Sequence, residues 1–94
     1  MSAYIIVHVS PKNPEKLQQY IGQVGPMVKK VGAEVMVQAK VSEVLNGDHT
    51  GKMTAVIRFP DMAAIKGWWS SDEYQAIVPL RNEGADMTII ALED

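Results

Sequence analysis

The sequence predicts an α+β fold in which a four-stranded antiparallel sheet carries its helices on one face. Short segments rich in β-branched residues stand near both ends of the chain, and two more flank a turn at Asn46-Gly47. Between these segments, apolar residues recur at the spacing of buried helical faces. The resulting order, β-α-β-β-α-β, is that of a ferredoxin-like sandwich. We expect residues 1–94 to form one such domain, with the first and third strands central and parallel to each other.

The first third of the chain predicts one strand and one long helix. Residues 3–9 form the strand. Asn13 can cap the following helix, and Pro14 suits its first position. Gly25-Pro26 predicts a kink or a brief break, because proline cannot donate a hydrogen bond to the preceding turn. Gly32 is expected to end the helix, whose buried face comprises Leu17, Tyr20, Ile21, Val24, Val28 and Val31.

A long hairpin follows this helix. The segment from Glu34 to about Leu45 is extended and pairs with residues 52–59 through a loose loop that contains His49. The last strand of the sheet is expected over residues 88–92.

Two helical segments separate the hairpin from the last strand. A short helix spans residues 62–69. Ser70 with Glu73 three residues later matches a capping box, so a second segment starts there. Pro79 is expected to bend this segment, and Gly84 to end it.

Composition excludes several classes of site and partner. Without cysteine, the chain cannot form disulfides, iron–sulfur clusters or thiolate zinc sites. The formal net charge is −2 and no basic stripe is present, so nucleic-acid binding is not expected. RNA-recognition domains share this strand order, but they need exposed aromatic residues on the third strand. Here that strand, residues 52–59, has no aromatic residue on the face directed away from the helices.

We also expect no membrane partner, no cofactor and no metal. The N-terminus lacks the basic region and long apolar run of a signal peptide. No segment approaches the roughly 20 apolar residues that span a bilayer. His49 has no second ligand at metal-binding spacing. These features predict a soluble, cytoplasmic protein.

Alternation along the predicted strands separates the two faces of the sheet. A uniformly apolar set is expected to pack against the helices: Ile5, Val7, Val9, Val35, Val37, Ala39, Met53, Ala55, Ile57 and Phe59. A mixed set covers the other face: Tyr4, Ile6, His8, Glu34, Met36, Gln38, Thr54, Val56 and Arg58. A half-apolar face of this kind suits a pocket or a self-association surface. We therefore expect a homodimer in which two sheets stack about a twofold axis, forming a barrel across the dimer.

His8 and Arg58 are the candidate catalytic residues. On adjacent parallel strands, roughly 5 Å apart, both side chains would reach one bound ligand. The ordinary pKa of histidine suits a general base, and arginine can hold a carboxylate or an enolate with two hydrogen bonds. Two structural alternatives stay open: His8 bonded to a backbone carbonyl, and Arg58 as a cross-strand partner of Glu34 or Glu43.

Six further residues are candidates for ligand binding: Tyr4, Gln38, Trp68, Trp69, Tyr74 and Arg81. Adjacent residues of a helix point about 100° apart. Trp68 and Trp69 therefore cannot both face one pocket, and we expect one in the core and the other at a rim. Tyr74 offers a hydroxyl to the cleft or packs with a polar tip. Arg81 either contacts an anion or complements the helix dipole.

The chain resembles the domain of unknown function 1330 family over nearly its whole length. The resemblance rests on Asn13-Pro14-Glu15 after the first strand, on Gly32, on residues 43–48 (EVLNGD), on Phe59-Pro60, and on residues 68–75 (WWSSDEYQ) together with Arg81. It implies a ferredoxin-like fold and a homodimer, in a family without a settled activity.

The chain departs from the pattern of that family in three segments. Asparagine precedes Pro14 where aspartate is usual, and Arg58 stands where an acidic residue often precedes Phe-Pro. Residues 38–40 (QAK) replace a frequent arginine-glycine-glycine. The last two changes alter the charge pattern of the mixed face.

More distantly, the chain is similar to the dimeric α/β-barrel superfamily, which includes cofactor-independent monooxygenases, isomerases and haem-degrading enzymes. Two functions follow as hypotheses. The first is a cofactor-independent oxygenase or isomerase that acts on a small aromatic or carbonyl compound. The second is a protein that binds or senses a small molecule without chemistry. In both cases the pocket would lie between sheet and helices or inside the dimer barrel.

Overall fold

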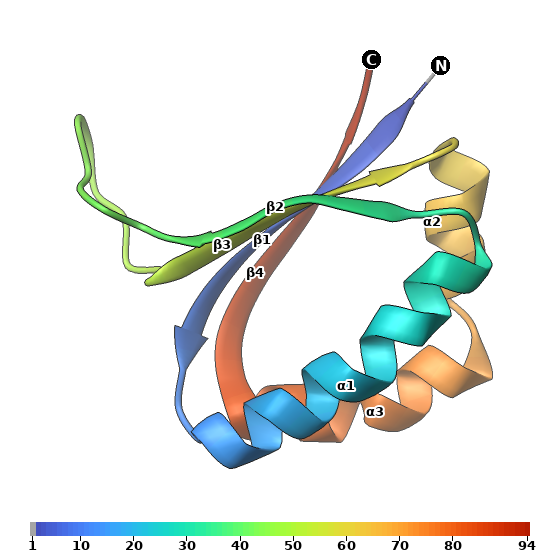
Figure 1. Ribbon diagram of the computed structural model, residues 1–94, viewed down its shortest axis with the longest axis horizontal. Helices are drawn as coiled ribbons and strands as arrows, with labels where there is room; N and C mark the ends of the chain where they lie inside the picture. Colours follow the sequence, from blue (N-terminus) through green and yellow to red (C-terminus); the bar gives the residue numbers. More distant parts are fainter. Residues whose placement is uncertain (1) are drawn as a thin grey trace.

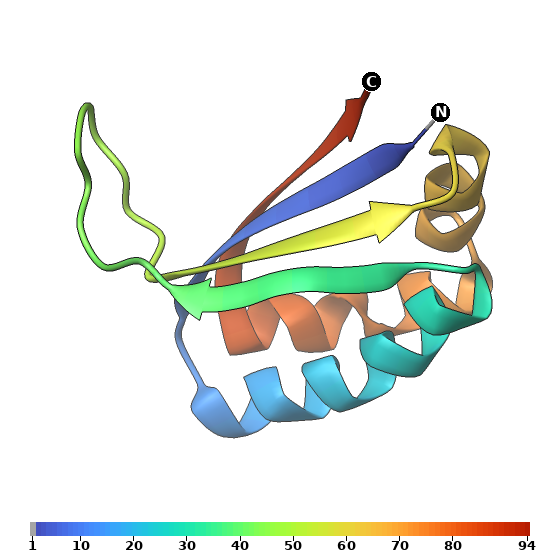
Figure 2. The ribbon, with the colours of Figure 1, turned by 45° about the horizontal axis from the view of Figure 1, so that its top comes forward.

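The computed structural model describes residues 2–94 and contains one four-stranded sheet with three helices. The elements are β1 (Ala3–Pro11), α1 (Pro14–Lys30), β2 (Glu34–Lys40), β3 (Met53–Phe59), α2 (Met62–Trp69), α3 (Asp72–Gly84) and β4 (Ala85–Glu93). The sheet has the order β2-β3-β1-β4. Figures 1 and 2 show α1 and α3 side by side beneath one face of the sheet, with α2 near the end of β3. The α+β, ferredoxin-like architecture is therefore confirmed.

Helix α1 begins and ends where the sequence predicts, but it is not broken in between. The Asn13 side chain accepts a hydrogen bond from the Lys16 backbone N–H. Gly32 follows the helix with a φ of 86°, a conformation that glycine adopts without strain, and its N–H donates to the Lys29 carbonyl. The helix runs continuously through Pro26, so the break that was one of the two expected outcomes does not occur. Burial of Val28 against the core on the far side of the proline holds the last turn in place.

The junction of α2 and α3 uses its two serines differently from the predicted capping box. Ser70 closes α2 by donating its hydroxyl to the Lys66 carbonyl at 2.7 Å. Ser71 caps α3 and accepts a hydrogen bond from the Tyr74 backbone N–H. The prediction that Ser70 caps the second segment is wrong by one residue, because the Ser70 hydroxyl already bonds to α2. Helix α3 continues through Pro79 and ends at Gly84.

The prediction that the first and third strands are parallel is wrong, since every adjacent pair in the sheet is antiparallel. The crossover through α1 returns β2 in the direction of β1, and β3 lies between them, antiparallel to both. His8 consequently lies opposite Thr54 of β3 and Thr88 of β4. Arg58 lies opposite Tyr4, which precedes His8 by four residues on β1. At the rise of a strand, that offset separates His8 from Arg58 by about 13 Å.

A β-bulge at Met36 reverses the two faces of β2. Val35 pairs with Ile57, but Val37 pairs with Val56, so the alternation shifts by one residue between them. Gln38 therefore points to the face covered by helices, which we call the helix face. Val37 and Ala39 point to the opposite, open face. The sequence-based assignment of these three residues is wrong because alternation alone cannot reveal a bulge.

The first strand of the hairpin, β2, is shorter than the predicted segment from Glu34 to about Leu45. Strand β2 ends at Lys40, and residues 41–52 form a loop that extends beyond the sheet in Figure 1.

The main core lies between the helix face and the helices. Its buried members are Ala3, Ile5, Tyr20, Val28, Phe59, Ile65, Trp68, Tyr74 and Ile77. A smaller cluster of Val9, Leu17 and Ala85 lies beside it. Within the described part of the chain, no helix combines the length and hydropathy that a membrane span requires.

Gly84 lets the end of α3 approach the start of α1. A Cβ atom at this position would stand 2.8 Å from the Leu17 backbone nitrogen and 2.9 Å from its Cα. The Gly84 carbonyl also accepts hydrogen bonds from the backbone N–H groups of Lys12 and Asn13. Because the obstructing atoms are backbone, neither helix can yield by a side-chain rotation.

We predict that Gly84→Ala lowers the free energy of unfolding by about 1–3 kcal/mol, the usual cost of forcing a methyl group into a packed contact. Urea denaturation of the purified variant measures this loss. Gly22→Ala is the matched control, because Gly22 is an exposed residue within α1 with open space around its Cβ position. The control should be stabilised by about 0.5–1 kcal/mol. Equal stability of the two variants would contradict the close approach of the helices.

Candidate ligand-binding site

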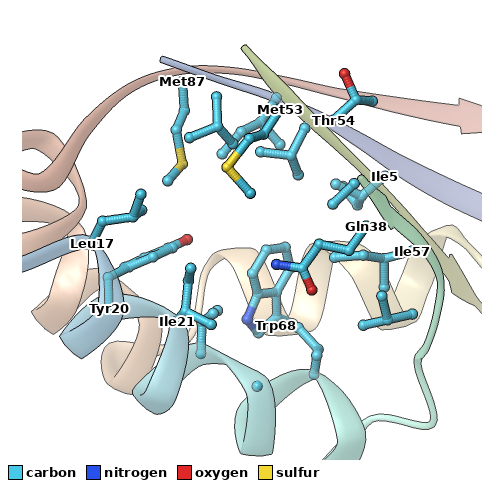
Figure 3. A pocket seen from close by; sticks show the side chains of 18 residues that line it. Ile5, Leu17, Tyr20, Ile21, Gln38, Met53, Thr54, Ile57, Trp68 and Met87 are labelled. Carbon is cyan, nitrogen blue, oxygen red and sulfur yellow. The ribbon is translucent and has the colours of Figure 1, made fainter. Parts of the chain in front are cut away.

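A cavity of about 130 Å³ lies between the helix face of the sheet and the helices. Its lining is almost entirely apolar and includes Ile5, Val7, Val9, Leu17, Tyr20, Ile21, Val24, Val28, Val35, Gln38, Met53, Ala55, Ile57, Trp68, Met87 and Ile89. Figure 3 shows these side chains around an open centre. An engineered apolar cavity of roughly 150 Å³ accepts benzene in another protein. The space here is therefore adequate for one small ring.

The cavity opens between β2 and α1. Val35 and Gln38 of β2 and Val24 and Gly25 of α1 belong to its lining. Val35 is half exposed although it points to the helix face, so the helices do not seal this edge of the sheet. In Figure 3 the Gln38 amide extends across the space toward Trp68. The bulge at Met36 is what turns this amide into the cavity.

Three polar side chains form a hydrogen-bonded chain that ends in the cavity. The Tyr20 and Tyr74 hydroxyl oxygens lie 2.9 Å apart. Arg81 donates from Nη1 to the Tyr74 hydroxyl, also at 2.9 Å. Tyr74 is completely buried, whereas Arg81 is half-buried near the surface. Figure 3 shows the Tyr20 hydroxyl pointing into the open centre. The chain thus connects the protein surface to the cavity.

Burial raises the pKa of the Tyr20 hydroxyl far above its ordinary value, and the hydrogen bond with Tyr74 raises it further. The charge of Arg81 offsets this only in part. Tyr20 therefore stays protonated well above the pH at which an ordinary tyrosine ionises, and it presents a neutral phenol to the cavity.

Trp68 forms one wall of the cavity and carries a buried donor without a partner. Its indole packs against Tyr74, with ring centroids 4.5 Å apart, and against Phe59 at 5.6 Å. Among residues 2–94, its Nε1 is the one buried side-chain polar atom that has no hydrogen-bond partner. Leaving such a group unsatisfied costs about 1–3 kcal/mol.

The predicted site residues separate into two groups. Gln38, Trp68 and Tyr74 lie at or beside the cavity, and Arg81 reaches it through Tyr74. Trp69 lies outside the cavity with 37% of its surface exposed, and the Arg81 guanidinium stacks 5.5 Å from the centroid of its ring. Trp68 is thus the core tryptophan and Trp69 the outer one.

Tyr4, His8 and Arg58 belong to the open face, on the other side of the sheet from the cavity. His8 Nδ1 lies 3.1 Å from the Thr54 hydroxyl, and its ring meets the edge of the His49 ring at 4.7 Å between centroids. A polar hollow of about 340 Å³ adjoins this histidine pair. Arg58 is exposed, with Tyr4 and Glu34 as its cross-strand neighbours. The expected joint site of His8 and Arg58 is therefore wrong for a single chain.

Tyr20 is the residue of this site that the sequence analysis missed. It appeared only as one member of the buried face of a helix. A buried tyrosine normally has a hydrogen-bond partner for its hydroxyl. The predicted burial of Tyr20 could therefore have indicated such a partner. The identity of the partner depends on how α1 packs against α3, which local sequence does not reveal. Within the described residues, no cluster of histidine, aspartate and glutamate could hold a metal ion.

We predict that Tyr20 makes stability fall at high pH. Above pH of about 10, the ordinary pKa of tyrosine, the unfolded state loses the Tyr20 proton while the folded state retains it. The folded state then binds more protons, so the free energy of unfolding declines by at most about 1.4 kcal/mol per pH unit for this group. In Tyr20→Phe this decline should disappear, whereas Tyr4→Phe should keep it. Urea denaturation at a series of pH values tests the difference, and parallel curves for all three proteins would refute it.

Solved structures with the same fold come from several bacteria. A protein of unknown function from Rhodopseudomonas palustris is 20% identical, with a TM-score of 0.82 over 99% of this chain and 82% of the other. A dimeric ferredoxin-like protein of unknown function from Jannaschia sp. CCS1 is 10% identical, with a TM-score of 0.78 and full coverage of both chains. SnoaB, a cofactor-independent oxygenase from Streptomyces nogalater, is 5% identical, with a TM-score of 0.72 over 99% of this chain and 92% of the other.

At such identities these likenesses show the fold alone. No curated protein matches this chain. The profile of the family described as "domain of unknown function (DUF1330)" matches residues 2–94. Because the match spans nearly the whole sequence, the chain belongs to the DUF1330 family.

Proposed function

We propose that this protein is a homodimeric small-molecule-binding protein whose ligand occupies the cavity between the sheet and the helices. The proposal rests on an apolar cavity that is large enough for one small ring. The hydrogen-bonded chain of Arg81, Tyr74 and Tyr20 ends at this cavity. Binding sites for small molecules have this composition, with apolar walls and a few polar groups that fix orientation.

Binding is favoured over catalysis by what lines the cavity. The lining contains no histidine, aspartate, glutamate or lysine, and its one titratable group is Tyr20. Burial raises the pKa of this hydroxyl, so it cannot accept a proton near neutral pH. His8 and Arg58, the candidate base and anion partner, lie on the other face and about 13 Å apart. They cannot act on one small molecule inside this cavity.

A cofactor-independent oxygenase or isomerase that acts on a small aromatic or carbonyl compound is the second candidate. It is supported by the likeness in fold to SnoaB, which is described as a cofactor-independent oxygenase, and fold alone does not assign a reaction. Mass spectrometry of a bound compound after incubation in air distinguishes the two candidates. Recovery of the compound unchanged supports binding, and a product in place of it supports the enzyme.

An exposed apolar row on the open face of the sheet supports the proposed homodimer. Its middle row, read across the sheet from β2 to β4, consists of Val37, Val56, Ile6 and Ile90. Val37 is 51% exposed and Ile90 44% exposed in the single chain. An apolar row of this kind, with polar residues on either side, is typical of an association surface. Two solved structures of this fold are described as dimeric.

We predict that Ile90→Glu converts the dimer to a monomer, because the stacked sheets would bury an unpaired carboxylate. Light scattering coupled to gel filtration measures the change in mass. Leu45→Glu is the matched control, since Leu45 lies in the loop between β2 and β3 and is 88% exposed. This control should remain dimeric. A wild-type protein that is monomeric at micromolar concentration, or an Ile90→Glu protein that stays dimeric, contradicts the arrangement.

We predict that methylenecyclohexane, a ring-sized hydrocarbon, raises the melting temperature of the wild-type protein. At a concentration a hundredfold above Kd the gain in stability is about 2.7 kcal/mol, which corresponds to roughly 10 °C or more for a domain of this size. Ala55→Leu should abolish the rise by placing a larger side chain in the cavity. Ala63→Leu makes the same change at an exposed position of α2 and should leave the rise intact. Calorimetry in sealed cells tests this, and equal responses of the two variants would place the ligand elsewhere.

A further inference from the structure

The direction of the hydrogen bonds between Arg81, Tyr74 and Tyr20 can be assigned from their chemistry. The Arg81 guanidinium can only donate, so the Tyr74 oxygen accepts from it. Tyr74 is fully buried, and its own proton needs an acceptor. The Tyr20 oxygen, at 2.9 Å, is its side-chain partner. The reverse direction would leave the Tyr74 proton buried without an acceptor.

The Tyr20 proton is then the free end of this chain. The Tyr20 hydroxyl has one side-chain partner among the described residues, Tyr74, and that bond uses its oxygen as acceptor. Its oxygen points toward the open centre of the cavity in Figure 3, where the remaining proton has space to be donated. The hydroxyl of Tyr20 is thus a donor at the cavity, so the complementary ligand is one that accepts a hydrogen bond.

The charge of the ligand follows from the walls of the cavity. No charged side chain lines it, and the positive charge of Arg81 is separated from it by Tyr74. A carboxylate in such surroundings would lose most of its hydration without a counter-charge. An alcohol or an amine would bring a donor, for which the lining offers Gln38 at the mouth and Thr54, whose hydroxyl lies 3.1 Å from His8 Nδ1. A ketone oxygen meets both conditions, because it is neutral and only accepts.

We propose that the ligand is a small neutral carbonyl compound of about one ring, whose oxygen accepts a hydrogen bond from Tyr20. This inference rests on the proposed function, since it names the chemical class of the molecule that the cavity binds. Arg81 and Tyr74 hold the Tyr20 proton toward the cavity and do not touch the ligand. Tyr20 is therefore the residue that determines specificity.

Titration calorimetry with two matched probes tests the inference on the full-length protein. Cyclohexanone and methylenecyclohexane have nearly the same shape and differ in a carbonyl oxygen against a methylene group. Tyr20→Phe removes one hydroxyl, and it should weaken cyclohexanone binding roughly fivefold, the value of one net hydrogen bond. It should change methylenecyclohexane binding by less than twofold. Tyr4→Phe, at the tyrosine of the open face, should change neither.

The outcomes separate this inference from the proposed function. If neither probe binds to the wild-type protein, the proposed function fails. If both bind and Tyr20→Phe changes their affinities equally or not at all, the cavity binds ligands but the carbonyl inference is overturned. Cyclohexanol binding as tight as that of cyclohexanone would likewise overturn it, because the site would then accept a donor.

A spectroscopic readout keeps the inference testable if Tyr20→Phe does not fold. The carbonyl stretching frequency of cyclohexanone bound to the wild-type protein should be lower than in a hydrocarbon solvent, because a hydrogen bond weakens the C=O bond. Infrared difference spectra measure this shift. A frequency equal to that in the hydrocarbon solvent would overturn the assignment.

Discussion

A four-stranded sheet has two faces, and this chain supplies helices for only one of them. Helices α1 and α3 lie beneath the helix face, and the open face keeps an apolar row across its middle. The cavity and the proposed dimer surface both follow from this difference between the two faces. The covered face contains the apolar cavity because the helices leave the edge at β2 unsealed. The uncovered face is the surface that we propose a second copy buries.

The cavity is a place where the packing of the core is incomplete. Protein interiors normally approach the density of organic crystals, and a chain of 94 residues has little core to spare. Here Val7, Ile21, Val24, Ile57 and Ile89 all face the cavity and remain only partly buried. The proposed ligand would bury the apolar surface that these side chains leave uncovered. In the same proposal, the hydrogen-bonded chain of Arg81, Tyr74 and Tyr20 orients the ligand from one end.

The candidate site was predictable in part. The spacing of Trp68 and Trp69 indicated that one ring is buried and the other lies outside, and the structure assigns these places to Trp68 and Trp69 respectively. Tyr74 and Arg81 were recognised as polar residues beside the tryptophans, and they do contact each other. The pairing of His8 with Arg58 failed because it assumed parallel central strands, and one wrong strand direction displaces a partner by several residues. Tyr20 was missed because the hydrogen-bond partner of its hydroxyl, Tyr74, lies on α3, far away along the chain.

The sequence by itself determined the elements and their order, since these depend on interactions between near neighbours. Asn13 and Gly32 act within one turn of the helix that they bound, and β-branched runs specify strands without reference to distant residues. Tertiary structure decided which side chains meet. A single bulge at Met36 turned Gln38 into the cavity, and the close approach permitted by Gly84 brought α3 against α1. These contacts join residues far apart along the chain, and their geometry arises from packing that no local pattern encodes.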